Sequence, residues 1–180
     1  MNISPIPAEW LPHYTYTDYE KWEGNWELMY GIPYALSPSP NRKHQLTGRR
    51  FMRLMEDALI NQRGACNCDI YYELDWIVNE TTVVRPDVMI VCGKFEEDFL
   101  RFPPVLIVEI ASKKTHLIDR NVKFNLYQNN GVKYYVLADM QKNSIDVFTL
   151  ENNRYHELNT TTFQLTASCT IELNFETMRY

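Results

Sequence analysis

Two acidic residues interrupt apolar runs of the sequence. Asp87 lies within residues 83–91, and Glu109 lies within residues 105–110. Burying an unpaired carboxylate in such a run costs on the order of several kcal/mol. Each acid is therefore tolerated only where something offsets its charge. A divalent cation held by both carboxylates would do so. Pairing with a nearby arginine, or a place in water at the end of a strand, would also suffice.

A lysine beyond the second acid is the third candidate. Lys123 stands four residues after Asp119 and four before Tyr127, which is itself expected in the core. Val122 and Leu126 lie alongside on a helix, so the lysine borders an apolar stripe rather than the solvated face. Its ammonium could point at an acidic centre and neutralise charge that develops on a phosphoryl group. It could equally pair with Asp119 or extend its stem over apolar surface.

Four further polar residues are weaker candidates. Glu73 is a third acid near the first two, or a polar residue on a strand face. Glu27 closes the site from an N-terminal hairpin, or makes a structural hydrogen bond. His44 extends the apolar stripe of a helix, where a partly buried core histidine is the default interpretation; in a cleft it would contact phosphate. Ser112 takes a direct part, or only makes local hydrogen bonds after the Glu109 strand.

The apolar pattern predicts the elements that position these residues. A stripe from His44 to Leu59 indicates an amphipathic helix that ends at Gly64. A second helix is expected over 119–130, with Gly131 as its stop. Short apolar runs between turn signals predict strands or hairpins over 25–37, 70–78, 83–91, 104–110, 133–139, 144–150, 155–158 and 163–175. The strand–helix–strand unit from 104 to 139 favours a partly parallel sheet.

Length and composition predict one α/β domain. The chain has 180 residues, of which 45% are hydrophobic, enough for a core and too apolar for a disordered tail. Residues 1–24, rich in Pro, Trp and Tyr, are expected to form an N-terminal arm that covers a cleft or joins a dimer. Residues 25–180 are expected to form the domain. No apolar run reaches the roughly 18 residues of a membrane helix, and no secretory signal is visible.

The charged residues and cysteines bound the partners and the compartment. A net charge of -5 excludes coating of nucleic acid through global charge. Basic residues cluster at 42–53 and 113–123, where they form a local nucleic-acid patch or a solvated helix face. Four cysteines are too few for a disulfide scaffold at this length, and Cys66 and Cys68 are too closely spaced for a zinc knuckle. We therefore expect reduced thiols and a cytoplasmic protein.

The chain carries an ordered set of short motifs between about residues 25 and 150. They are Trp26–Gly31, Ser37-Pro38 followed by His44, Arg85-Pro86-Asp87-Val88, Val108-Glu109-Ile110-Ala111-Ser112, Asp119-Arg120-Asn121-Val122-Lys123, Tyr127 and Gly131–Tyr135. Together they resemble the Uma-two type of restriction endonuclease, a family of the PD-(D/E)XK nuclease superfamily. The resemblance implies a restriction-endonuclease-like core, a mixed β-sheet flanked by helices, behind an N-terminal hairpin and arm.

The resemblance also implies a site. Asp87 and Glu109 match the two acidic metal ligands, and the strand carbonyl of Ile110 would complete a set of oxygens suited to Mg²⁺ or Mn²⁺. Position 111, where the lysine of the (D/E)-x-K motif would stand, holds alanine. Lys123 occupies the place from which the family supplies its lysine, and Lys113 is the alternative.

The function implied is that of a Mg²⁺-dependent endonuclease that hydrolyses phosphodiester bonds of DNA. Asp87, Glu109 and Lys123 would be catalytic, with Glu73, Glu27, His44, Ser112 and Asp119 in support. A homodimer is expected, because cutting a duplex often requires two active sites. The rival interpretation is an inactive nuclease-fold protein that acts as a nucleic-acid-binding or assembly module; the alanine at position 111 keeps this interpretation open. A serine or cysteine hydrolase is disfavoured, because the sequence has no G-x-S-x-G elbow.

Overall fold

A six-stranded mixed sheet forms the centre of the protein, in a computed structural model that describes residues 10–36, 39–62, 66–112 and 117–178. The strand order is β10-β9-β8-β7-β6-β3. Their bounds are β3 Cys68–Tyr72, β6 Val88–Cys92, β7 Leu106–Ala111, β8 Tyr134–Asp139, β9 Ser144–Glu151 and β10 Arg154–Glu157. Strands β7 and β8 are parallel, and the other neighbours are antiparallel. The predicted strand–helix–strand unit is therefore confirmed.

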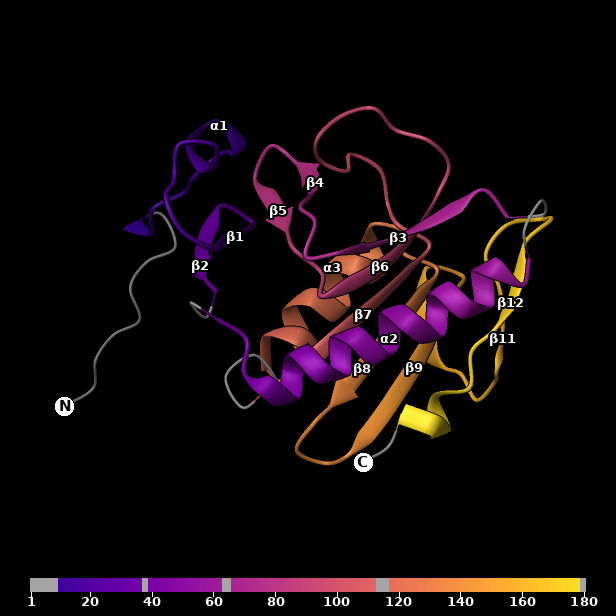
Figure 1. The fold of residues 1–180 in the computed structure, drawn as a ribbon. Coiled ribbons are helices and arrows are strands. Elements are labelled where there is room, and N and C mark those ends of the chain that lie inside the picture. The colour runs from indigo at the N-terminus through magenta and orange to yellow at the C-terminus, as the bar shows by residue number, and fades with distance from the viewer. Residues whose placement is uncertain (1–9, 37–38, 63–65, 113–116, 179–180) are drawn as a thin grey trace.

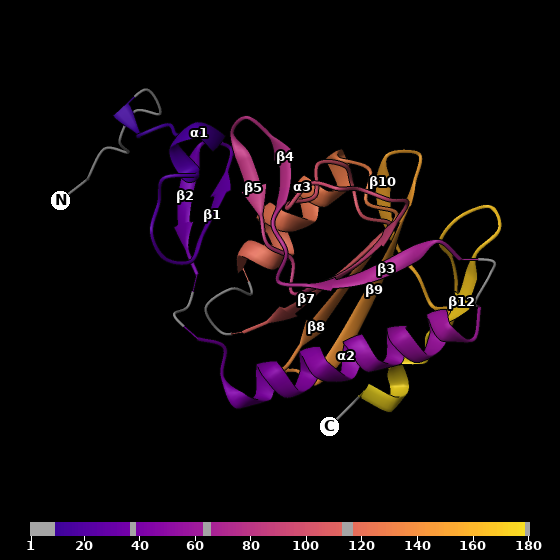
Figure 2. The same ribbon diagram turned by 45° about the horizontal axis from the view of Figure 1, so that its top comes forward.

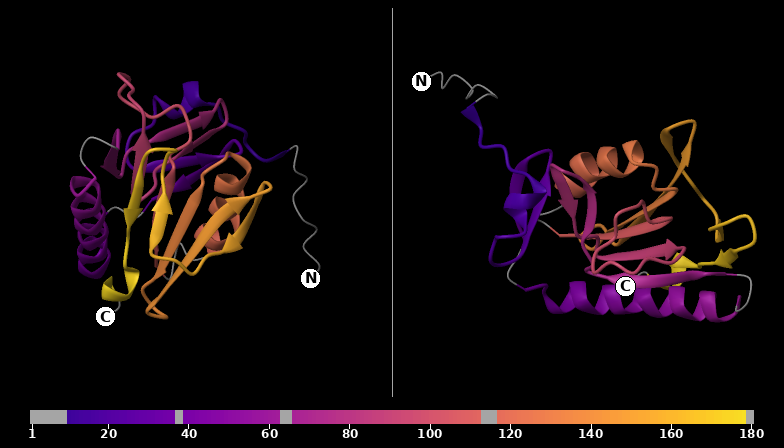
Figure 3. Two further views of the ribbon diagram at one scale, coloured as in Figure 1. Left: turned by 90° about the vertical axis from the view of Figure 1, so that its right-hand side faces the viewer. Right: turned by 90° about the horizontal axis from the view of Figure 1, so that it is seen from above.

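Helices cover both faces of this sheet (Figure 3). Helix α2 (Arg42–Ile60) runs across one face, and Phe51 and Met55 bury their side chains against it. The π-helical turn η2 (Ile118–Lys123) and helix α3 (Phe124–Asn129) cover the other. Because successive side chains of a strand point to opposite faces, β7 divides its residues between the two layers. Glu109 lies on the η2–α3 side.

A second sheet of four strands is built partly from the N-terminal part of the chain (Figure 2). Its order is β2-β1-β5-β4, with bounds β1 Trp26–Met29, β2 Ile32–Ala35, β4 Trp76–Asn79 and β5 Thr82–Val84. The predicted hairpin in the 25–37 segment is β1–β2. The short helix α1 (Tyr16–Tyr19) belongs to the arm, whose aromatic residues pack on Leu28, Ile77 and Val83. This packing ties the described part of the arm to the sheet.

Helix α2 contains the predicted stripe from His44 to Leu59 and begins two residues before it, at Arg42. The side chain of Asn41 accepts hydrogen bonds from the backbone N–H groups of Lys43 and His44, which caps the helix. Gly48 allows a close approach to the sheet: a Cβ at this position would lie 3.0 Å from the Tyr72 ring. This contact helps to fix the helix over β3 and β7 (Figure 1). Gly64, the predicted helix stop, lies outside the described residues.

Three predicted strands are corrected. The segment 70–78 forms β3 and β4, separated by Glu73 with a positive φ of 50°. The segment 83–91 forms β5 and β6, because Pro86 has no N–H to donate and its neighbourhood leaves the ladder. Asp87 therefore precedes a strand rather than lying inside one. The tail forms β11 (Thr162–Gln164), β12 (Thr170–Glu172) and a 3₁₀ turn, η3 (Phe175–Met178), instead of one strand.

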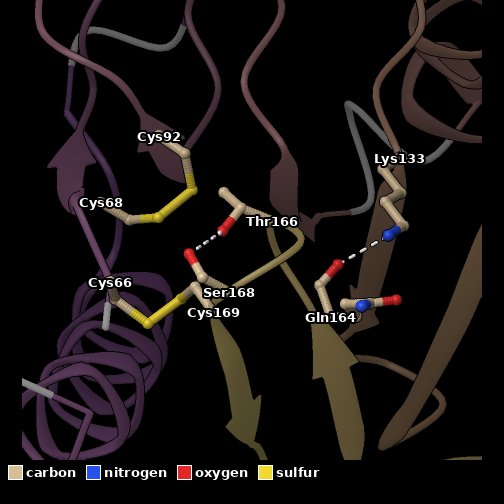
Figure 4. The surroundings of a disulfide bond; sticks show 8 residues. All are labelled: Cys66, Cys68, Cys92, Lys133, Gln164, Thr166, Ser168 and Cys169. Carbon is tan, nitrogen blue, oxygen red and sulfur yellow. Dashed lines mark hydrogen bonds between the residues drawn. A yellow bond between two sulfur atoms is a disulfide. The ribbon is translucent and has the colours of Figure 1, made fainter.

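The cysteines correct another expectation. Cys66 is bonded to Cys169, and Cys68 to Cys92 across β3 and β6, so in the described part of the chain no cysteine is free. Figure 4 shows the two bridges beside one another. The expectation of reduced thiols is wrong because the fold brings together residues that are 103 and 24 positions apart. Disulfides are rare in the cytoplasm. The cytoplasmic location therefore stays a prediction, and the two disulfides count against it.

Membrane insertion by a helix finds no support. Among the described residues, every helix is too short or too polar to cross a bilayer.

Candidate active site

A buried acid–lysine–acid cluster lies between the two sheets. Strand β7 is buried along its whole length, and the side chain of Glu109 is only 3% exposed. Its Oε1 lies 3.0 Å from Lys123 Nζ and accepts a hydrogen bond of 2.5 Å from the Tyr127 hydroxyl. Glu27, on β1, places its own Oε1 2.8 Å from the same ammonium. Lys123 is thus held between two carboxylates.

The backbone around this cluster explains why each side chain points inward. Glu27 Oε1 also accepts a hydrogen bond of 2.8 Å from the backbone N–H of Arg85, which ties β1 to the end of β5. Lys123 is the last residue of the π-helical turn, and Tyr127 follows on α3. π-Helical turns are rare in proteins, and those that occur are often found at functional sites. Of the alternatives that the sequence left open for Lys123, the one directed at an acidic centre agrees with the described residues, in which its ammonium contacts Glu27 and Glu109.

Asp87 forms the more open side of the site. Its Oδ2 accepts a hydrogen bond of 2.7 Å from the backbone N–H of Ile110 and lies 3.2 Å from His44 Nε2. The residue after Glu109 is therefore bonded to Asp87, and the two predicted ligands belong to one neighbourhood. The side chains of His44 and Asp87 are 14% and 17% exposed, so solvent reaches this side.

The electrostatics reflect an excess of acid. Burial raises the pKa of Glu109 well above its usual value; Lys123 opposes this, while Asp87, Asp119 and Glu27 add to it. Burial lowers the pKa of Lys123, but the surrounding carboxylates outweigh burial and hold it well above the usual value. The surrounding carboxylates thus favour the charged form of Lys123. Burial also lowers the pKa of His44, but the hydrogen bond and charge of Asp87, together with the charges of Glu73 and Asp119, outweigh burial and raise the pKa.

The two acids suit a hard divalent cation. In the described residues the hydrogen bonds to these two acids fall on one oxygen of each, Oδ2 of Asp87 and Oε1 of Glu109. The other two oxygens, Oδ1 and Oε2, could therefore coordinate a cation. The described residues contain no group of three or more His, Cys, Asp and Glu arranged to hold a metal. Mg²⁺ is commonly bound by one or two carboxylates with waters and phosphate oxygens, so two acids fit it.

The structure gathers most of the predicted residues. Asp87, Glu109 and Lys123 come together with Glu27 and His44.

The other predicted residues differ in their burial and contacts. Asp119 is buried on η2 and acts on Glu109 through its charge. Glu73 is exposed and acts on the pKa of His44 in the same way. Ser112 is half-buried directly after β7. Ile110 contributes its N–H to Asp87. Lys113 lies outside the described residues.

Sequence reasoning missed two contacts. Tyr127 was expected in the core; it is buried, yet its hydroxyl donates to Glu109. The i, i+4 spacing from Lys123 was the available signal, because it places both side chains on one helix face. Arg85 pairs with Asp75 at 2.6 Å rather than with Asp87, and nothing in the sequence singles out that partner.

Two comparisons establish the fold and the family of the chain. The fold resembles the crystal structure of a "putative nuclease belonging to DUF820" from Anabaena variabilis, with a TM-score of 0.67, 14% identity, and coverage of 82% of this chain and 85% of that one. The core thus shares the mixed α/β fold of that structure. Residues 16–178 match the model of the Uma2 family, described as "Putative restriction endonuclease". The chain belongs to the Uma2 family.

One relative is similar to this protein over most of the chain. The "Uncharacterized protein slr1290" of Synechocystis sp. is 28% identical over 156 residues, which cover 81% of this chain and 79% of the relative.

Proposed function

We propose that the protein is a Mg²⁺-dependent endonuclease that hydrolyses phosphodiester bonds of DNA. The observation that carries the proposal is the buried Glu109–Lys123 pair next to the partly open Asp87. Lys123 offsets the charge of two buried carboxylates. It is suited to oppose negative charge on a phosphate that enters from the Asp87 side.

In this proposal Asp87 and Glu109 hold the cation through the oxygens that protein hydrogen bonds leave uncommitted. Mg²⁺ or Mn²⁺ bound there would supply charge relief and a more acidic water. Lys123 stabilises the charge that develops on the phosphate oxygens. Glu27 and Tyr127 position Lys123 and Glu109, because their contacts leave these two side chains little freedom.

The N-terminal part of α2 supplies a surface for the DNA backbone. Three basic residues are exposed on this helix: Arg42, Lys43 and Arg49. The same helix also contains His44, which contacts Asp87. Lysine and arginine side chains attract phosphates and release counterions, so binding should weaken with salt. We also propose that the enzyme acts as a homodimer, since hydrolysis of both strands of a duplex requires two sites.

A hydrolysis assay tests the proposal. Wild type with Mg²⁺ or Mn²⁺ should nick and linearise supercoiled DNA, and EDTA should stop it. Glu109→Gln should reduce the rate by about a hundredfold or more, because it removes a ligand charge and the partner of Lys123. Glu56→Gln, an exposed acid on α2, should cut like wild type.

Two results would contradict the proposal. Equal rates for Glu109→Gln and wild type would assign the cutting to a contaminant. DNA binding without cutting, unchanged by loss of Asp87, Glu109 and Lys123, would support the inactive binding module instead.

A further inference from the structure

A second pocket, lined by aromatic rings, lies next to the acid–lysine cluster. It has a volume of about 300 Å³ and is walled by Tyr16 and Tyr19 of α1, by Trp22 and Trp26, and by Phe99. Its polar members include Asp75 and Arg85. This volume is at the lower end of the range for small-molecule sites. A pocket of this size suits one planar ring system rather than a large ligand.

Two residues connect this pocket to the proposed active site. Trp26 and Glu27 are neighbours on β1, so their side chains point to opposite faces of the strand. Glu27 contacts Lys123, while Trp26 lines the pocket. Arg85 makes the same connection: its backbone N–H donates to Glu27 Oε1, and its guanidinium lines the pocket. A ligand in the pocket would therefore be separated from the acid–lysine cluster by a single strand.

The charged groups of the pocket are the Arg85–Asp75 ion pair and the exposed carboxylate of Glu20, so the lining is negative in sum. Arg85 Nε donates to Asp75 Oδ1 at 2.6 Å, and the Tyr19 hydroxyl donates to Asp75 Oδ2 at 2.8 Å. Asp75 is 5% exposed, so its charge is balanced inside the protein. Such a lining offers no surplus positive charge to a phosphate. It offers apolar ring faces together with hydrogen-bonding groups, which match a neutral heteroaromatic ring.

We propose that the pocket binds one unstacked nucleobase of the strand whose phosphate lies at the acid–lysine cluster. The inference rests on the proposed function and extends it to single-stranded or locally opened substrate. Every base has a π-face that can stack on an aromatic side chain, so binding here would tolerate many sequences. Phe99, 41% exposed at the pocket, is the ring with the most surface free to stack.

The test measures the fluorescence anisotropy of a labelled single-stranded oligonucleotide. One measurement is made with Mg²⁺, and a second is made in EDTA, which prevents cutting. Phe99→Ala should bind the oligonucleotide at least about fivefold more weakly than wild type. This is the effect expected when one base loses its stacking partner. An abasic strand of equal charge should bind both proteins equally. Trp10→Ala is the matched control: Trp10 is 74% exposed and does not line the pocket, so its loss should change nothing.

The outcomes separate this inference from the proposed function. Equal binding by Phe99→Ala and wild type, no preference for bases over the abasic strand, or no binding by wild type would overturn the pocket inference, even if the protein hydrolyses DNA. A Phe99 effect in a protein that cuts no DNA would retain the pocket as a base-binding site and overturn the nuclease. Competition by a free mononucleotide as effective as the oligonucleotide would also overturn the inference, because it would show binding without a strand.

Discussion

Lys123 is the residue on which the electrostatics of the centre depend. It is 5% exposed by side chain and lies within 3.0 Å of both Glu27 and Glu109. Buried ion pairs add little net stability, because desolvation of both charges cancels most of their attraction, yet removal of one partner leaves a buried charge. Such a pair is therefore better explained by chemistry than by stability.

Replacing Lys123 with methionine should lower the free energy of unfolding by about 3–5 kcal/mol, since Glu109 then lies buried without its partner. Urea unfolding measures this. Adding Glu109→Gln to the same protein should restore part of the loss, because the orphaned charge is gone. Lys142→Met, at an exposed position, serves as control. The account of the pair fails if Lys123→Met unfolds at the same urea concentration as the control.

The residues of the site were accessible to sequence analysis because their types conflict with their surroundings. Asp87, Glu109 and Lys123 are charged groups beside apolar runs, and that conflict is visible in one sequence. Their partners were not. The contact between Glu27 and Lys123 joins residues 96 positions apart, and it depends on how β1 packs against η2.

The elements hold the site through the packing of α2 and η2–α3 on opposite faces of the sheet. The burial of β7 on both faces and its parallel pairing with β8 follow from the sequence, because a strand buried on both faces reads as an apolar run, which here only Glu109 interrupts. The π-helical turn does not, since its period is too close to that of an α-helix over six residues. The breaks at Glu73 and Pro86 were missed because the apolar residues on either side continue one pattern.

Phe51→Ala tests the α2 layer. The ring of Phe51 is fully buried, with its centroid 5.7 Å from that of Phe175. Truncation should lower the free energy of unfolding by about 3–5 kcal/mol, because it removes apolar contacts and leaves a cavity. Chemical denaturation would measure the loss, with Arg49→Ala at an exposed position of the same helix as control. A loss below about 1 kcal/mol would mean that α2 does not pack on the sheet as described.

At the scale of the whole molecule, two disulfides join distant parts of the chain. The Cys66–Cys169 bond ties the segment after α2 to the segment before β12, and Cys68–Cys92 links β3 to β6. Sequence alone could not give this pairing, because four cysteines allow three connectivities. Closing a loop restricts the unfolded chain, and the restriction grows with loop length.

The Cys66→Ser/Cys169→Ser variant should therefore lose more stability than Cys68→Ser/Cys92→Ser. We expect about 4–5 kcal/mol for the longer loop and about 3–4 kcal/mol for the shorter one, from thermal and urea unfolding without reductant. Thiol titration of the denatured, unreduced wild type should detect no free thiol. Detection of four thiols, with unfolding insensitive to reductant, would show that the bonds do not form.

Metal binding is the most direct test of the central claim, that Asp87 and Glu109 hold a divalent cation. Isothermal titration calorimetry with Mn²⁺ should show binding to wild type and to Asp98→Asn, an exposed acid in the loop before β7. Asp87→Asn should bind at least about tenfold more weakly, since loss of a carboxylate ligand should cost no less than loss of an outer-shell partner. Equal Mn²⁺ affinity for Asp87→Asn and wild type, or no binding to either, would contradict the account.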